Sequence, residues 1–125
     1  MLVTGGENSR ITLFGVNIVI VLSTSELFDP ANGTFAATGS MTNLRTGQSA
    51  ILLKDGNVLG AGGNNVIALD TAELFDPLSG SFLPTGSMET ARTSHEATLL
   101  NSGKVLVTGG QAGGGAILAS AELYQ

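Results

Sequence analysis

The chain alternates short apolar runs with glycine-containing turns over most of its length. HEATLL (95–100) and KVLVTG (104–109) are joined by NSG, and DPLSG (76–80) leads from AELFD (72–76) into SFLPT (81–85). Short runs rich in β-branched and aromatic side chains, bounded by such turns, predict β-strands that pair as hairpins. No stretch has a convincing helical period, so we expect an all-β protein.

The strand pattern belongs to a repeat of 47 positions. Residues 25–63, SELFDPANGTFAATGSMTNLRTGQSAILLKDGNVLGAGG, recur as residues 72–110, AELFDPLSGSFLPTGSMETARTSHEATLLNSGKVLVTGG. Partial copies flank these two, because LVTGG begins at Leu2 and SAELYQ begins at Ser120. Each full unit contains four candidate strands, and the chain contains ten. The glycines and charges that recur in register are interpreted as structural: Gly5, Gly6, Gly62, Gly63, Gly109, Gly110, Glu26, Glu73, Glu122, Arg45 and Arg92.

These elements resemble the kelch repeat in its bacterial form, through the VLVTGG strand, the AELFDP strand, the TGSM segment and the GKVLV run. The resemblance covers the chain except residues 7–24 and implies a β-propeller fragment of about two and a half blades, with four antiparallel strands per blade. The blades would be a partial one (1–41), a complete one (42–88) and a second partial one (89–125). Propellers close with about four to eight blades, so we expect further blades in a longer chain.

Composition and charge exclude several classes of partner. The formal net charge is −5 with only five Lys and Arg residues, which argues against nucleic acid as a ligand. The longest apolar run, ITLFGVNIVIVL (11–22), is shorter than the roughly 20 residues of a membrane-spanning helix, so no membrane span is expected. The resemblance suggests an extracellular or cell-surface location, although MLVTGGENSR lacks the features of a signal peptide.

The segment KVLVTGGQAGGG (104–115) invites comparison with the phosphate loop of a dinucleotide-binding fold. Such a loop needs G-x-G-x-x-G spacing, a following helix and an acidic residue about 20 positions later. None of these is present, and the same double glycine occurs in three copies. We therefore interpret the glycines as strand-ending backbone turns, and we expect no nucleotide or other cofactor.

The recurring charges and the lone histidine do not form a catalytic constellation. A catalytic site needs unique residues in one place, whereas the glutamates and arginines recur once per unit. We expect Glu73 to accept hydrogen bonds from Arg92 or from backbone N–H groups and so to tie strands together. The resemblance also includes galactose-oxidase-like enzymes, whose copper site needs two histidines and two tyrosines. His95 and Tyr124 are the only residues of their kinds, so no metal site and no enzyme activity are expected in this chain.

Function is expected where the units differ, in the loop after each double glycine and in the connection between units. The residues that we expect to contact a ligand are Glu7, Asn8, Arg10, Asn43, Asn64, Asn65, Glu89 and Gln111. The sequence predicts a non-catalytic binding or scaffold module for a protein or a glycan. The alternatives are a fragment of a galactose-oxidase-like, carbohydrate-active enzyme with its catalytic residues elsewhere, and a cell-surface repeat array. The insertion after Gly6 is either an extra hairpin, a poorly ordered segment or a decayed repeat.

Overall fold

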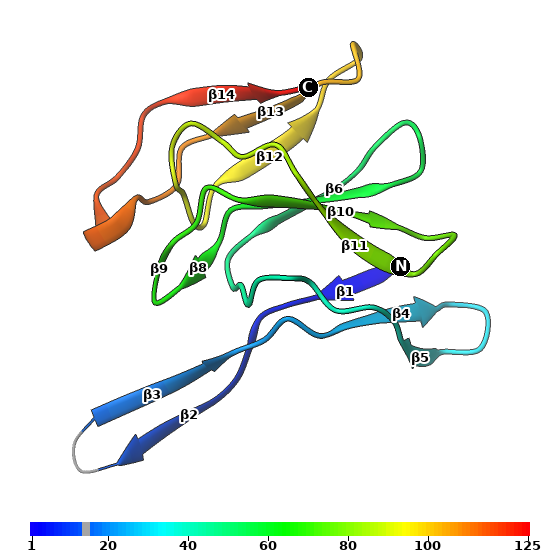
Figure 1. The fold of residues 1–125 in the computed structure, drawn as a ribbon, viewed down its shortest axis with the longest axis horizontal. Coiled ribbons are helices and arrows are strands. Elements are labelled where there is room, and N and C mark those ends of the chain that lie inside the picture. The colour runs from blue at the N-terminus through cyan, green and yellow to red at the C-terminus, as the bar shows by residue number, and fades with distance from the viewer. Residues whose placement is uncertain (14–15) are drawn as a thin grey trace.

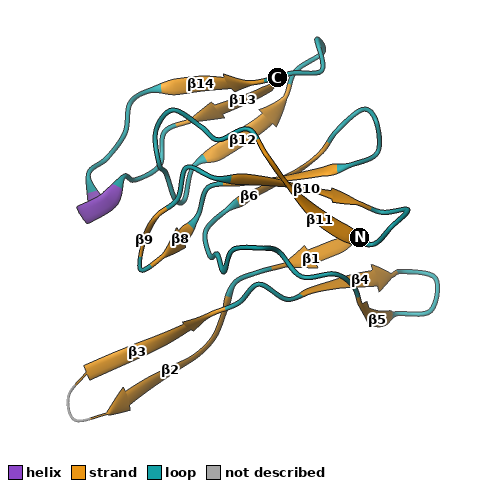
Figure 2. Cartoon of the chain, viewed as in Figure 1, coloured by secondary structure: helices purple, strands orange, loops and turns teal. Residues whose placement is uncertain are grey.

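A computed structural model describes the backbone of residues 1–13 and 16–125 and the side chains of residues 1–7 and 19–125. Three antiparallel sheets follow one another along the chain and stack in that order (Figure 1). The only helical element among the described residues is one 3-10 turn, so the all-β expectation is confirmed (Figure 2). The strands of the three sheets are β1 (Leu2–Thr4), β4 (Ser25–Asp29) and β5 (Thr34–Ala37); β6 (Ser49–Leu52), β7 (Val58–Ala61), β10 (Ala72–Asp76) and β11 (Ser81–Thr85); and β12 (Glu96–Leu99), β13 (Val105–Thr108) and β14 (Ala121–Tyr124).

The middle sheet contains one full repeat unit as a four-stranded meander in the order β6-β7-β10-β11. The first sheet, β1-β4-β5, has the last three strands of a unit, and the third, β12-β13-β14, has the first three. The turns between the strands are those that the sequence predicts: Gly33 and Gly80 have a φ of +70° and +66° in the DPANG and DPLSG turns. No sheet closes on itself among the described residues, so the fold shown is three stacked antiparallel sheets.

Two hairpins and a short turn lie outside these sheets. The insertion after Gly6 forms a hairpin of β2 (Glu7–Leu13) and β3 (Val16–Val21), which extends away from the first sheet (Figure 1). The extra-hairpin alternative is therefore confirmed, with residues 14–15 outside the described part. A smaller hairpin joins β8 (Asn64–Asn65) to β9 (Ile67–Ala68), and the 3-10 turn spans Gly113–Gly115.

The apolar core lies between the sheets because alternate residues of each strand face a neighbouring sheet. Between the first and second sheets, Leu2 and Leu27 pack against Phe75, Phe82 and Met41. Between the second and third sheets, the buried residues form one cluster: Leu59, Ala61, Ala72, Met88, Val105 and Val107. The stacking order of the sheets thus follows directly from the recurrence of the same apolar positions in each unit.

A buried ion pair joins the strands of the middle sheet. The Arg45 side chain is fully buried, and its Nη1 donates to the carbonyl oxygens of Gly62 and Thr71 at 2.7 and 2.9 Å. Its Nη2 donates to Glu73 Oε2 at 2.9 Å. The expected pairing of Glu73 with Arg92 is wrong, because Arg45 is the arginine that donates to this carboxylate. The alternative expectation of backbone N–H donors is confirmed, since Thr42 N–H donates to Glu73 Oε1 at 2.6 Å.

Arg92 makes the equivalent contacts one unit later. Its Nη1 donates to the carbonyl oxygens of Gly109 and Ser120, and its Nη2 donates to Glu122 Oε1 at 2.6 Å. The Glu122 side chain keeps 14% of its surface exposed, against 1% for Glu73. The first copy, Glu26, is exposed and has no ion-pair partner among the described residues.

Backbone N–H groups complete both carboxylate sites. Burial by itself raises the pKa of Glu73, but hydrogen bonds from Thr42 and then from Arg45 and the Asn43 N–H outweigh it and hold that pKa below its usual value. Burial also opposes ionisation of Glu122, whose pKa is lowered by Arg92 and by backbone N–H groups. Both glutamates are therefore anions at neutral pH. Each binds the connection that precedes its sheet to the third strand of its unit, which is β10 for Glu73 and β14 for Glu122.

Candidate functional site

A groove of about 780 Å³ lies where the loops that follow the double glycines meet the connections between units. Four of the residues expected to contact a ligand line it: Glu7, Asn64, Asn65 and Gln111. They come from all three units, one or two from each. The repeat thus brings loops that are far apart in the sequence to one groove.

Backbone hydrogen bonds fix the walls of this groove. Thr46 and Asn64 exchange both backbone bonds, at 3.1 and 2.8 Å, and Thr93 and Gln111 do the same at 2.9 Å each. Within each unit, therefore, the connection before the first strand is bonded to the loop after the second. The walls are held in place before any ligand arrives, which lowers the entropic cost of binding.

The double glycines are the reason that the loops can leave the sheets at this place. Gly62 N–H donates to the Thr71 carbonyl in its own sheet at 3.0 Å, and Gly63 N–H donates to the Arg92 carbonyl of the next unit at 2.9 Å. All six glycines have φ between +64° and +102°, in the left-handed region that favours glycine. After Gly110 the chain runs through a single 3-10 turn into β14, and no helix follows that could hold a phosphate. Equivalent bonds are made by Gly5, Gly6 and Gly109.

Two of the other residues expected to contact a ligand, Asn43 and Glu89, do not line the groove. The Asn43 N–H donates to Glu73, and the Glu89 N–H donates to Glu122, so these connections serve the buried carboxylates. Asn8 and Arg10 belong to β2, but their side chains lie outside the described residues. The predicted set therefore contains four groove residues and two that support the fold.

Exposed aliphatic side chains, which the sequence analysis did not select, form the rest of the rim. Val19 and Ile20 from the β2–β3 hairpin are each 40% exposed, and Leu44 is 42% exposed. Val66, at the tip of the β8–β9 hairpin, is 93% exposed. A cluster of exposed apolar side chains beside amide and hydroxyl groups is typical of a surface that binds a partner. The only feature of the sequence that indicates this exposed rim is the apolar character of the loops.

Val66 also has a strained backbone. Its φ is +69°, and a β-branched residue in this region is a genuine outlier. The strain arises because Asn65 pairs with Ile67, which leaves a single residue to reverse the chain. Strain of this kind costs about 1–3 kcal/mol and is concentrated at functional sites. As a result of this backbone conformation, the apolar Val66 side chain is exposed to solvent at the rim of the groove.

The described lining residues can supply hydrogen bonds and apolar contacts. Apart from Glu7, the groove residues whose side chains are described carry no charge, and the polar ones are Asn, Gln, Thr and Ser. Among the described residues, no three His, Cys, Asp or Glu side chains come together as a metal site. In the part of the chain that the structure covers, no helix has the length and hydropathy to cross a membrane.

His95 lies outside the groove and is buried between the second and third sheets. Its Nε2 is 2.9 Å from Ser49 Oγ, but its Nδ1 is buried without a hydrogen-bond partner. A serine nucleophile needs a base that a third group orients, and among the described residues no side chain is hydrogen-bonded to His95 Nδ1. In the preceding unit the same position is Gln48, whose Nε2 donates to the Thr4 carbonyl. The pair is therefore a packing contact between sheets.

Acidification is expected to destabilise the protein through His95. Burial and the neighbouring Arg92 charge lower the pKa of His95 from 6.5, so the unfolded chain binds this proton more tightly. The free energy of unfolding should fall as the pH drops below 6.5, by at most about 1.4 kcal/mol per pH unit. Urea unfolding at pH 7.5 and 5.5 measures this. His95→Gln, which copies Gln48, should remove the dependence, and equal slopes for both proteins would contradict the prediction.

Comparison with known protein families and with curated proteins gives no match for this chain. The resemblance to kelch repeats therefore rests on the repeated motifs of the sequence. Function has to be argued from the groove itself.

Proposed function

We propose that this protein is a non-catalytic binding module built of kelch-type units, and that its groove takes an extended peptide segment of a partner protein. The observation that carries the proposal is the convergence of loops from all three units on one groove with fixed walls. Further units of the same kind would extend the sheet stack into a propeller. We infer a protein partner from the chemistry of the side chains at the groove rim.

The rim chemistry favours a peptide over a glycan. Asn64, Asn65 and Gln111 offer amide donors and acceptors that match a peptide backbone. The exposed aliphatic side chains of Ile20 and Val66 offer contacts to apolar side chains. Among the side chains that the structure describes, those that line the groove include no Phe, Tyr or Trp on which a sugar ring could stack.

The proposal predicts that charge at the groove rim abolishes peptide binding without loss of fold. Peptides selected from a displayed random library on the 125-residue protein should bind Val66→Asp at least tenfold more weakly, because an apolar contact is replaced by an uncompensated charge. Aspartate tolerates positive φ better than valine, so the thermal unfolding temperature should not fall. Isothermal titration calorimetry and thermal unfolding measure the two quantities.

Leu78 provides a matched control for this experiment. It is 97% exposed, but it lies in the turn between β10 and β11 and does not line the groove. Leu78→Asp should therefore bind the selected peptides as the parent protein does. If Val66→Asp retains full binding, or if a glycan array gives ligands while the peptide library gives none, the proposed function is wrong.

A further inference from the structure

The position that follows each double glycine carries a side chain that ends in a carboxyl or carboxamide group. These residues are Glu7, Asn64 and Gln111, one in each unit, and all three line the groove. The side-chain amides of Asn64 and Gln111 make no hydrogen bond to another described residue. The groove therefore presents amides whose hydrogen-bonding capacity is unused, at equivalent positions of neighbouring units.

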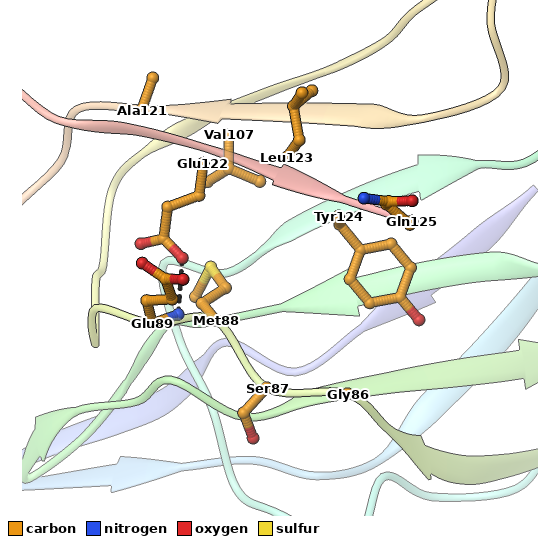
Figure 3. A pocket seen from close by; sticks show the side chains of 10 residues that line it. All are labelled: Gly86, Ser87, Met88, Glu89, Val107, Ala121, Glu122, Leu123, Tyr124 and Gln125. Carbon is orange, nitrogen blue, oxygen red and sulfur yellow. Dashed lines mark hydrogen bonds between the residues drawn. The ribbon is translucent and has the colours of Figure 1, made fainter.

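The polar groups of a second cavity are instead bonded within the chain. This cavity, of about 420 Å³, lies beside β14, where Glu122 faces the segment 86–89 (Figure 3). The Glu122 carboxylate accepts from the N–H groups of Glu89 and Thr90, at 2.6 and 3.1 Å, and from Arg92. The groove, and not this cavity, offers amides that a polar ligand can use.

Backbone hydrogen bonds set the distance between the two amides of the groove. Gly63 N–H donates to the Arg92 carbonyl, and the next residue, Thr93, exchanges both backbone bonds with Gln111. From Asn64 to Gln111 there are thus two steps, each between hydrogen-bonded neighbouring segments. Because such extended segments lie about 4.8 Å apart, equivalent positions of neighbouring units are about 9.6 Å apart.

The same two steps occur one unit earlier. Gly6 N–H donates to the Arg45 carbonyl at 3.0 Å, and Thr46 exchanges both backbone bonds with Asn64. Together these bonds join five short segments into one row across the three units: 6–7, 45–46, 63–64, 92–93 and 110–111. The spacing of about 9.6 Å is therefore repeated along the groove.

Small residues alternate with the longer side chains along this row. The connections between units contribute Thr46 and Gly47 to the groove lining, and Thr93 and Ser94 one unit later. Ser94 has φ +53°, in the left-handed region where Gly47 has φ +65°, and the Ser94 N–H donates to the Gly47 carbonyl at 2.9 Å. Small residues at these places leave space for one ligand side chain per unit.

A peptide can meet each unit in the same way only if its own conformation repeats with the spacing of the row. In a polyproline II helix three residues complete a turn and advance about 9.3 Å, so every third side chain points in the same direction. In a β-strand the side chains on one face are about 6.7 Å apart, or about 13.4 Å for every second one. The spacing of the row therefore matches a polyproline II helix and not a β-strand.

The polyproline II helix also fits the chemistry of the groove. It has no internal hydrogen bonds, so its carbonyl oxygens, including those of proline, are free to accept from the Asn64 and Gln111 amides. Proline rings are apolar and fit the exposed aliphatic side chains of Leu44 and Val66. Since the conformation is populated before binding, less conformational entropy is lost.

We propose that the groove binds a polyproline II segment of a partner protein, which runs along the row and presents one residue in three to each unit. The amides of Asn64 and Gln111 donate to main-chain carbonyls three residues apart, and the side chains in between occupy the spaces beside the small residues. This assignment rests on the proposed function of the groove, and it can fail while peptide binding stands.

Insertions into a bound peptide test the three-residue period directly. The probe is the tightest binder that selection on the 125-residue protein yields from a displayed library of the form (Pro-x-x)4. Insertion of Ala or Ala-Ala at its centre should weaken binding at least tenfold, because the residues beyond the insertion then face away from the row. Insertion of Ala-Ala-Pro keeps the period and should bind at least fivefold more tightly than the Ala-Ala peptide. Isothermal titration calorimetry measures all four peptides.

Protein variants assign the peptide residues to individual units. Asn64→Ala and Gln111→Ala should each weaken binding about three- to tenfold, the contribution of one hydrogen bond, without a change in thermal unfolding. Removal of one terminal triplet from the peptide should abolish the effect of Gln111→Ala and preserve that of Asn64→Ala. Asn101→Ala is the matched control and should bind as the parent does, since Asn101 lies in the turn between β12 and β13 and does not line the groove.

The outcomes separate this proposal from the function of the groove. A peptide that tolerates two inserted residues better than three is bound as a β-strand, which overturns the proposal. Full binding to both Asn64→Ala and Gln111→Ala also overturns it. If the (Pro-x-x)4 library gives no binder but an unrestricted library gives peptides that Val66→Asp rejects, the proposal is wrong and the proposed function stands. If neither library gives a binder, both are wrong.

Discussion

Replacement of Arg45 with methionine should lower the free energy of unfolding by about 3–5 kcal/mol, the range for a buried charge that loses its partner. The variant leaves the Glu73 carboxylate, which is 1% exposed, without its cationic partner. It also removes the donors to the Gly62 and Thr71 carbonyl oxygens. Urea unfolding at pH 7 measures the loss, with the tyrosine signal of Tyr124 as the probe.

Two further variants test the cause of that loss. Arg92→Met should cost less than Arg45→Met, because Glu122 keeps 14% of its side chain exposed and water can solvate it. The double variant Arg45→Met with Glu73→Gln should recover part of the stability, since no unpaired charge remains buried. If Arg45→Met and Arg92→Met cost the same, or if the double variant is less stable than Arg45→Met, burial of the glutamate is not what makes the arginine necessary.

Much of the fold can be predicted from the sequence, because each strand pattern occurs in more than one copy of the repeat. The two full copies place strands and turns at the same offsets, so a weak signal in one copy is supported by the other. The turn glycines Gly33 and Gly80 illustrate this, since both have the left-handed φ that the turn needs. The stacking of whole sheets follows from the apolar positions, which recur on both faces of each unit.

The partner of each arginine could not be obtained from the repeat alone. Glu73 lies between Arg45 and Arg92 in the sequence, and the two arginines are equivalent positions of neighbouring units. Each arginine lies in the connection between two sheets. The arginine that pairs with Glu73 depends on whether each connection packs against the sheet that precedes it or the sheet that follows it. The structure shows the second arrangement, because the backbone N–H groups of Thr42 and Asn43 are bonded to the same carboxylate.

The candidate groove was predicted in part. Variable loops pointed to Asn64, Asn65 and Gln111, and the structure brings these residues together. Val66 could not be selected from the sequence, because its exposure and its positive φ result from the pairing of Asn65 with Ile67.

Replacement of Gly62 with alanine should lower the free energy of unfolding by about 2–5 kcal/mol, as the sum of a left-handed alanine and of overpacking. The residue has φ +64°, and a Cβ there would lie 2.5 Å from the Arg92 carbonyl oxygen and 2.7 Å from His95 Cε1. The carbonyl cannot move away, because it accepts a hydrogen bond from Gly63 N–H at 2.9 Å. The expected damage is therefore at the junction of the second and third sheets.

Gly109→Ala is the matched control, because it changes the same motif position without the clash. Its φ is +66°, almost that of Gly62, and the nearest atom to a Cβ is the Leu118 carbonyl oxygen at 3.7 Å. It should cost only the conformational part, about 1–2 kcal/mol. The difference between the two variants in urea unfolding measures how much of the double-glycine requirement comes from close approach of the next sheet. Equal losses would mean that backbone conformation alone demands the glycine, and that the sheets can separate slightly at no cost.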